Sequence, residues 1–202
     1  MLAKNNIPTD PKLETLIQSF KRSSPINEKI INCFRAIDRK FFVVNELNKH
    51  LVDNPQQVMD AARDSPYYDA PSQIGWNTTI SAPGMHYSTL RYLYDHMITA
   101  GKLLDIGTGS GFVSACMAEL SPNDAKIYAV DHIEAINDFA RFNIQKICPH
   151  FIKKDKIIFV TKDGRQGLST FQGNHMLYDV IHVGGQLNEV EEAKEQEQEQ
   201  EQ

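Results

Sequence analysis

The alternation of short apolar runs with helical patterns in the second half of the chain most constrains its fold. Helical patterns cover residues 112–120 and 134–147. The four apolar runs that suit strands are Leu103–Ile106, Lys126–Val130, Ile157–Thr161 and Asp179–Val183. Because strands that alternate with helices lie parallel and are covered by them, residues 101–185 predict an α/β core with a parallel sheet.

Before this core, residues 1–100 predict an N-terminal segment that packs with it as one domain. Asp10 and Pro11 form a start signal for a first helix, and Ser24 and Pro25 repeat that signal for a second. Their apolar faces hold Leu13, Leu16, Ile17 and Phe20, then Ile30, Ile31, Phe34 and Ile37. Residues 45–76 are polar and turn-rich, which predicts surface loop with at most one short helix.

A glycine-rich turn follows the first core strand, with the sequence Asp105-Ile106-Gly107-Thr108-Gly109-Ser110-Gly111. Glycines there let the backbone approach a ligand, and the next helix presents free N–H groups. A dinucleotide site requires a third glycine at position 112, which is Phe here. The spacing, with an acid before it, resembles motif I of S-adenosylmethionine methyltransferases, and a tight turn without ligand is the alternative.

Acidic residues end the next two strands. Asp131 lies 20 residues after Gly111 and is placed to hydrogen-bond a ribose. Asp163 and Gly164 end the third strand at the same edge, where an acid can accept from an adenine amino group. Ordinary turn residues are the alternative for both positions.

Residues 73–86, QIGWNTTISAPGMH, match neither helix nor strand periodicity and predict a donor-rich loop before a helix from about Tyr87 to Met97. This segment is similar to the I-G-x-x-x-T-I-S-x-P signature of protein-L-isoaspartate O-methyltransferases. Further similarities to the eukaryotic branch are carried by residues 34–43, 130–133, 163–165 and 178–184. The resemblance covers about residues 13–185 and implies a Rossmann-like S-adenosylmethionine methyltransferase fold.

The resemblance also implies site residues. Ser81 would be the active-site hydroxyl. S-adenosyl-L-methionine would contact Thr78, Thr79, Ile80, Ser81, His86, Asp105, Gly107, Gly109, Gly111, Asp131, His132, Asp163 and Gly164. The substrate would be the free carboxylate of L-isoaspartyl residues, and also of D-aspartyl residues, in damaged proteins. A carboxylate is ionised near pH 7, so Ser81 would orient it as a hydrogen-bond donor and would not act as a nucleophile.

Composition excludes several classes of protein. Residues 189–202 hold seven Glu and one Lys, and the remaining chain carries 20 basic and 19 acidic residues, with no surplus for nucleic acid. No apolar stretch suits a membrane span or secretory signal, and three cysteines without CxxC spacing predict reduced thiols, so we expect a cytoplasmic protein. His86, His132 and His182 have no metal-ligand spacing, which predicts no metal.

Two departures from the family pattern concern the substrate side. Gly84 stands where the family usually has His, so we expect loop packing to differ there. Residues 45–68 also form a longer stretch than usual.

A third departure is the low-complexity tail at residues 186–202, where the family's sheet continues. We therefore expect a fold incomplete at the C-terminal side of the sheet, with residues 179–183 at an open edge. Ile181 and Val183 are predicted to be buried on both faces in the complete fold. The family is typically monomeric, and association through the open edge is expected here.

Two alternative functions stay open at this point. Motif I alone would allow a methyltransferase for another substrate, although residues 79–83 argue against it. The tail favours a truncated form that binds the cofactor but has weak or no activity.

Overall fold

The computed structural model describes residues 10–23, 26–56, 58, 66–168 and 176–185. Its centre is a parallel sheet of four strands in the order β5-β4-β3-β6. The bounds are β3 (Lys102–Ile106), β4 (Lys126–Asp131), β5 (Ile157–Thr161) and β6 (Val180–Val183). The predicted parallel α/β core is confirmed, with β6 beginning one residue later than expected. Asp179 instead accepts hydrogen bonds from the backbone N–H groups of Gly101 and Lys102.

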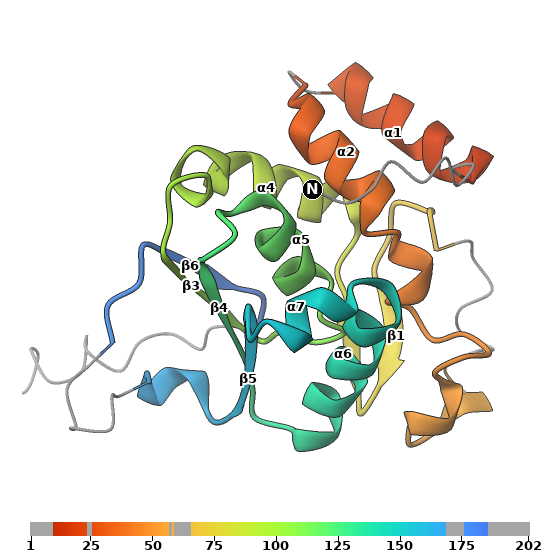
Figure 1. Ribbon diagram of the computed structural model, residues 1–202. Helices are drawn as coiled ribbons and strands as arrows, with labels where there is room; N and C mark the ends of the chain where they lie inside the picture. The colour runs from red at the N-terminus through yellow and green to blue at the C-terminus, as the bar shows by residue number, and fades with distance from the viewer. Residues whose placement is uncertain (1–9, 24–25, 57, 59–65, 169–175, 186–202) are drawn as a thin grey trace, which may run out of the picture.

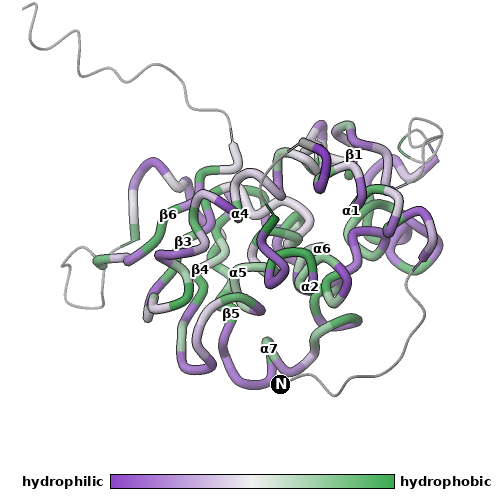
Figure 2. Tube along the Cα trace, turned by 90° about the horizontal axis from the view of Figure 1, so that it is seen from above, coloured by the Kyte–Doolittle hydropathy of each residue, from purple (hydrophilic) through white to green (hydrophobic). Residues whose placement is uncertain are grey.

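Helices pack on one face of this sheet, as Figure 1 shows. They are α4 (Pro83–Met97), α5 (Phe112–Leu120), α6 (Glu134–Ile147) and the short, unpredicted α7 (Pro149–Lys153). The bounds of α5 and α6 agree with the predicted ones. In Figure 2 the hydrophobic stretches concentrate where the strands meet α5. A smaller apolar cluster of Leu104, Val130 and Leu168 lies on the other face of the sheet.

The N-terminal helices cover the outside of this helical layer. In α1 (Pro11–Ser23) the Asp10 carboxylate accepts a hydrogen bond from Lys12 N–H, as its predicted capping role requires. The second helix, α2 (Glu28–Ala36), is capped by Asn27, so the predicted start at Ser24 and Pro25 is wrong; those two residues themselves lie outside the described part. The Phe34 ring packs edge-on against Phe112, with ring centroids 5.5 Å apart. The described part also contains the 3-10 turns η1 (Arg39–Phe41), η2 (Lys49–Leu51) and η3 (Gly164–Gln166).

The segment before α4 is a β-hairpin, not the loop that the sequence predicted. Its antiparallel strands are β1 (Ser72–Gly75) and β2 (Thr78–Ile80). The connecting residues Trp76 and Asn77 both have positive φ, 49° and 56°, as a two-residue hairpin turn requires. Strands this short show no measurable alternation, and the turn lacks the usual glycine. The following helix α4 also begins four residues earlier than expected, with Pro83 in its first turn.

One apolar cluster joins the N-terminal segment to the core. It contains side chains from α1, α2, the hairpin, α4, α5 and the sheet, so these described elements pack around a common core. The domain division at residues 100 and 185 stays a prediction. Ile181 and Val183 do not join this core in the described part of the chain. They are 53% and 39% exposed, which agrees with the expected loss of cover on these two residues. Of the residues of β6, Val180 lies in the main core. The strand β6 lies at the border of the described sheet, and Ile181 pairs with Leu104, which belongs to the smaller cluster on the other face.

None of the described helices is long and apolar enough to cross a membrane.

A packing role for Gly111 gives the first testable prediction. Its φ is +87°, and a Cβ there would lie 3.0 Å from Ile144 Cδ1 and 3.1 Å from Ala140 Cβ of α6. Gly111→Ala should therefore lower the free energy of unfolding by about 2–4 kcal/mol, through backbone strain and overpacking. Chemical denaturation measures this.

Gly167 is the control without a contact, because nothing lies within 4 Å of a built Cβ there. Its φ and ψ of 61° and 178° are open essentially only to glycine, so Gly167→Ala should cost backbone strain of about 1–3 kcal/mol. A loss in Gly111→Ala no larger than the strain of its left-handed conformation, about 1–2 kcal/mol, would show that the contact with α6 carries no weight.

Candidate functional site

The carboxyl ends of β3, β4 and β6 meet the β1–β2 hairpin around two cavities. The large cavity, about 620 Å³, opens beside the ends of β4 and β5. The small cavity, about 140 Å³, lies between the hairpin, the start of α4 and the end of β6. Thr79, Gly107, Gly109, Val183 and Gly184 line both cavities, so the two adjoin across the glycine turn. This is the edge at which parallel α/β sheets bind their ligands.

The glycine turn is held against the end of β4 by its backbone. The N–H groups of Gly107 and Thr108 both donate to the Val130 carbonyl, at 2.8 and 3.0 Å. Gly107 and Gly109 have φ of +76° and +53°. A Cβ on Gly107 would lie 2.9 Å from the Gly185 backbone nitrogen, so glycine is required for this close approach of two chain segments.

The large cavity is bordered by the predicted nucleoside-binding residues. They are Thr78, Thr79, Gly107, Gly109, Asp131, His132, Asp163 and Gly164. The buried Asp131 carboxylate accepts hydrogen bonds from the N–H groups of Gly109 and Ile133, at 3.3 and 3.2 Å. His132 is exposed, with its Nδ1 3.4 Å from Asp131. Asp131 thus presents an anchored hydrogen-bond acceptor at the end of β4, as the sequence predicted.

Asp163 lies at the rim of the large cavity and caps η3. Its carboxylate accepts hydrogen bonds from the Arg165 side chain, at 2.6 to 3.1 Å, and from the Arg165 backbone N–H. The hydrogen bonds from the Arg165 side chain, then that from its backbone, lower the pKa of Asp163 to about 2. A Cβ on the neighbouring Gly164 would overlap the Ile106 side chain. The Asp163 carboxylate is therefore an ionised acceptor already engaged by a cation.

The small cavity collects the other predicted residues around one buried carboxylate. Thr79, Ile80, Ser81, His86 and Asp105 line it. Asp105, fully buried at the end of β3, accepts a short hydrogen bond from the Ser114 hydroxyl of α5. Its other oxygen lies 2.7 Å from His182 Nδ1 on β6. Burial alone would lower the pKa of His182, but the hydrogen bond to Asp105 and its negative charge outweigh burial and raise it.

His86 brings a neutral imidazole to the same cavity. It is buried, and its ring lies 4.9 Å from the Phe112 ring, centroid to centroid. Burial, with the charges of Arg39 and His182, holds the pKa of His86 well below its ordinary value. The small cavity therefore pairs His182, whose protonated form the Asp105 carboxylate favours, with His86, whose neutral form burial favours.

Two outcomes for individual residues differ from the sequence prediction. Gly111 lines neither cavity, because it starts α5 and packs on α6. His182 was considered only as a metal ligand and dismissed, yet it lies in the small cavity beside Asp105. The rule that ligand-facing residues stand at the carboxyl ends of parallel strands could have identified it. Among the described residues, no group of three or more His, Cys, Asp or Glu could hold a metal ion.

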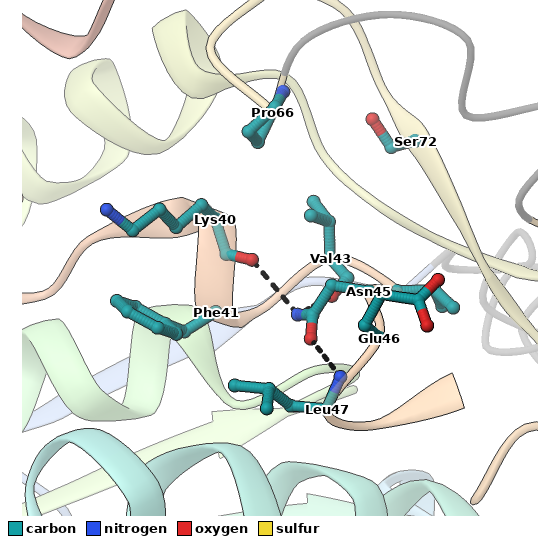
Figure 3. A pocket seen from close by; sticks show the side chains of 9 residues that line it. Lys40, Phe41, Val43, Asn45, Glu46, Leu47, Pro66 and Ser72 are labelled. Carbon is teal, nitrogen blue, oxygen red and sulfur yellow. Dashed lines mark hydrogen bonds between the residues drawn. The ribbon is translucent and has the colours of Figure 1, made fainter. Parts of the chain in front are cut away.

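Another cavity, about 390 Å³, lies away from the glycine turn near η1. Figure 3 shows Asn45 in its wall, where the side-chain amide donates to the Lys40 carbonyl and its oxygen accepts from Leu47 N–H. None of the predicted site residues lines this cavity, and its wall is mainly apolar. It is not part of the candidate site.

Comparison with known proteins decides the family. The family profile described as protein-L-isoaspartate(D-aspartate) O-methyltransferase (PCMT) matches residues 12–199. The chain belongs to this family. It is 36% identical over 125 residues to a Caenorhabditis elegans protein-L-isoaspartate O-methyltransferase, a match that covers 62% of the chain and 54% of the relative. It is 32% identical over 177 residues to protein-L-isoaspartate O-methyltransferase 2 of Arabidopsis thaliana, covering 87% of the chain and 50% of the relative.

These matches span about half the length of both curated relatives. A solved structure agrees in fold: a candidate protein-L-isoaspartate O-methyltransferase from Plasmodium falciparum, in complex with S-adenosyl-L-homocysteine. It superposes with a TM-score of 0.68 at 22% identity, covering 91% of this chain and 77% of the other. The Rossmann-like fold expected from the family resemblance is thereby confirmed.

The Asp105–His182 pair of this family member predicts a specific pH response. In the folded chain His182 should titrate above its ordinary pKa, because Asp105 stabilises the protonated imidazole. Asp105→Asn removes the carboxylate charge but leaves the His182 ring buried, so the pKa of His182 should fall below its ordinary value. NMR titration of the His182 ring protons measures both. His150, whose pKa is lowered by burial and by Lys154 and Lys156, should titrate unchanged.

The same pair should contribute to stability in a defined pH range. The pKa of His182 is raised in the folded chain, so protonation of His182 stabilises the fold. This stabilisation is complete below the pKa of His182 in the unfolded chain, about 6.5. It is lost as the pH rises through the pKa of His182 in the folded chain. The stability difference between the wild type and Asp105→Asn should narrow over that rise. A difference that widens instead would contradict a protonated His182.

Proposed function

We propose that the two adjoining cavities bind S-adenosyl-L-methionine and that the chain catalyses methyl transfer to the free carboxylate of isoaspartyl residues. The observation that carries this proposal is that twelve of the thirteen predicted contacts border the two adjoining cavities. They come from the hairpin, the start of α4, the glycine turn and the ends of β3, β4 and β5. Family membership supports the cofactor and the substrate class. The damaged proteins that carry isoaspartyl or D-aspartyl residues are the proposed partners.

The residues that line the two cavities suit different parts of the cofactor. Asp131 would accept from ribose hydroxyls, because it is buried, anchored by two backbone N–H groups and faces the large cavity. Asp163 would meet the adenine amino group at the rim, with Arg165 holding the carboxylate ionised. Gly107 and Gly109 leave room for the cofactor between the two cavities, since side chains there would narrow the passage. S-adenosyl-L-methionine would supply an activated methyl group on a sulfonium sulfur.

The small cavity fits the reacting carboxylate. Ser81, from the junction of β2 and α4, would donate its hydroxyl to orient the carboxylate, which is already ionised and needs no general base. His182, whose protonated form Asp105 favours, would offset the negative charge of Asp105 at the wall that receives this anion. His86 would stay neutral, so it could donate or accept a hydrogen bond without adding charge. A bound substrate would displace water from this small cavity, which would strengthen each of these interactions.

The direct test is methyl transfer from labelled S-adenosyl-L-methionine to an isoaspartyl hexapeptide. The control is the same hexapeptide with normal aspartate, and we expect label only on the isoaspartyl form. A chain that binds cofactor but labels neither peptide would favour the cofactor-binding form without activity. Label on a small-molecule acceptor alone would favour a methyltransferase for another substrate.

The cytoplasmic location, the monomeric state and the association through the β6 edge stay predictions. The exposure of Ile181 and Val183 on this bordering strand supports the last of them.

Asp131 gives a prediction about cofactor affinity. Asp131→Ala should weaken S-adenosyl-L-homocysteine binding by about 1–3 kcal/mol, because it removes charge-assisted hydrogen bonds. Isothermal titration calorimetry measures the change, with Asp138→Ala on α6 as a control that should keep full affinity. Unchanged affinity of the Asp131 variant would refute its role.

Ser81 gives a prediction about the chemical step. Ser81→Ala should lower kcat for the isoaspartyl peptide by about tenfold or more while leaving cofactor affinity nearly intact, since a positioning donor acts mainly in the transition state. The serine hydroxyl lines only the small cavity. Loss of cofactor binding with unchanged turnover per bound complex would make Ser81 structural instead.

A further inference from the structure

A groove of about 470 Å³ runs over the exposed side of the first turns of α4, the helix labelled beside β6 in Figure 1. Its lining residues are Asp69, Ala82, Gly84, Met85, Ser88, Thr89 and Tyr92. Met85 and Thr89 also line the small cavity. A polypeptide whose reacting residue enters the small cavity beside Ser81 therefore finds a continuous path out over α4.

One acidic side chain stands in this groove. The Asp69 carboxylate accepts a hydrogen bond from the Gly84 N–H at 2.7 Å. A Cβ on Gly84 would lie 2.6 Å from Asp69 Oδ2 and 3.0 Å from Oδ1. The carboxylate occupies the space that a side chain at position 84 would take, so this chain's glycine is what allows an acid over the start of α4.

The charges around the groove favour a cation near Asp69. Asp69 is exposed and is the one charged residue in the groove lining. Arg39 lies behind it, fully buried, with its Nε donating to the Pro66 carbonyl at 2.9 Å. Burial lowers the pKa of Arg39 to about 10, and the charge of Asp69 opposes that shift. Arg39 therefore partly offsets the charge of Asp69 from behind, and Asp69 is the charged group that a ligand in the groove can contact.

The rest of the groove suits the carbon chain of a long side chain. Met85 and Tyr92 are 60% and 77% exposed, and a lysine or arginine stem can lie on such surface while its head meets an acid. At the far end Arg91 lies over the Tyr92 ring, 5.7 Å from its centroid. The acidic end of the groove is thus the end that starts at Gly84, next to the junction with Ser81.

We propose that this groove binds the residue that neighbours the isoaspartyl residue in a substrate polypeptide, and that Asp69 makes lysine or arginine the preferred neighbour. The inference rests on the proposed function, because it places the reacting carboxylate in the small cavity. Gly84 sets the preference by leaving the carboxylate its place. An exposed ion pair of this kind corresponds to a preference of roughly two- to fivefold.

The test uses four labelled isoaspartyl hexapeptides, with Lys or Glu immediately before or immediately after the isoaspartyl residue. Their binding to the full chain is measured by fluorescence anisotropy with S-adenosyl-L-homocysteine present. The wild type should bind the Lys peptide about two- to fivefold more tightly than the Glu peptide at one of the two positions. The ratio should fall as salt rises.

Three variants decide whether Asp69 is the cause. Asp69→Asn keeps the shape and the acceptor oxygen and should reduce the ratio to about one. Gly84→Ala keeps the charge but displaces the carboxylate, and should also reduce the ratio. Asp95→Asn, an exposed acid further along α4 and outside the groove lining, should leave the ratio unchanged.

Each other outcome contradicts a defined part of the account. Equal binding of all four peptides by the wild type, or an unchanged ratio in Asp69→Asn, would overturn the groove assignment and leave the proposed function intact. An equal loss of the ratio in Asp95→Asn would assign the preference to the general charge of the molecule. Failure of every peptide to bind would contradict the proposed substrate, and the groove assignment with it.

Discussion

The buried carboxylate of Asp105 is the interaction on which the site depends. A carboxylate removed from water is costly unless hydrogen bonds replace its hydration, and here Ser114 of α5 and His182 of β6 do so. These two hydrogen bonds tie β3 to α5, the helix that follows the glycine turn, and to the neighbouring strand β6. Because the glycine turn lies between Asp105 and Ser114, its position follows from these bonds. A shift of either partner would leave a buried charge without compensation.

The second constraint is the way the N-terminal segment closes the site. The hairpin and the start of α4 bring Thr79, Ser81 and His86 over the glycine turn, and the edge-on contact of Phe34 and Phe112 links α2 to α5 beneath them. Thus one side of the site comes from residues before the sheet and the other side from the ends of its strands. The same arrangement leads from the small cavity to the α4 groove, where the absence of a side chain at Gly84 admits Asp69.

The sequence predicted the core well because its strands and helices are long or strongly periodic. The bounds of α5, α6 and β5 agree with prediction, and all predicted site residues except Gly111 border the cavities. The failures have physical reasons. The hairpin strands are too short for a period, and its turn places Trp76 and Asn77 at positive φ without glycine. The Asn27 side chain caps α2 by accepting from Lys29 N–H, a residue that the Ser-Pro start signal did not indicate. His182 and Asp105 are 77 residues apart in the sequence, so no local sequence pattern predicts their contact.

The central claim is that one ligand, S-adenosyl-L-methionine, spans both cavities across the glycine turn. The most direct measurement is a titration of the isotope-labelled chain with S-adenosyl-L-homocysteine, followed by amide chemical shifts in NMR. The account predicts that the changes concentrate at Gly107, Gly109 and Ile133 and extend to Thr79 of the hairpin, while the cavity around Asn45 stays unaffected. No change at the glycine turn, or changes confined to the Asn45 cavity, would contradict it.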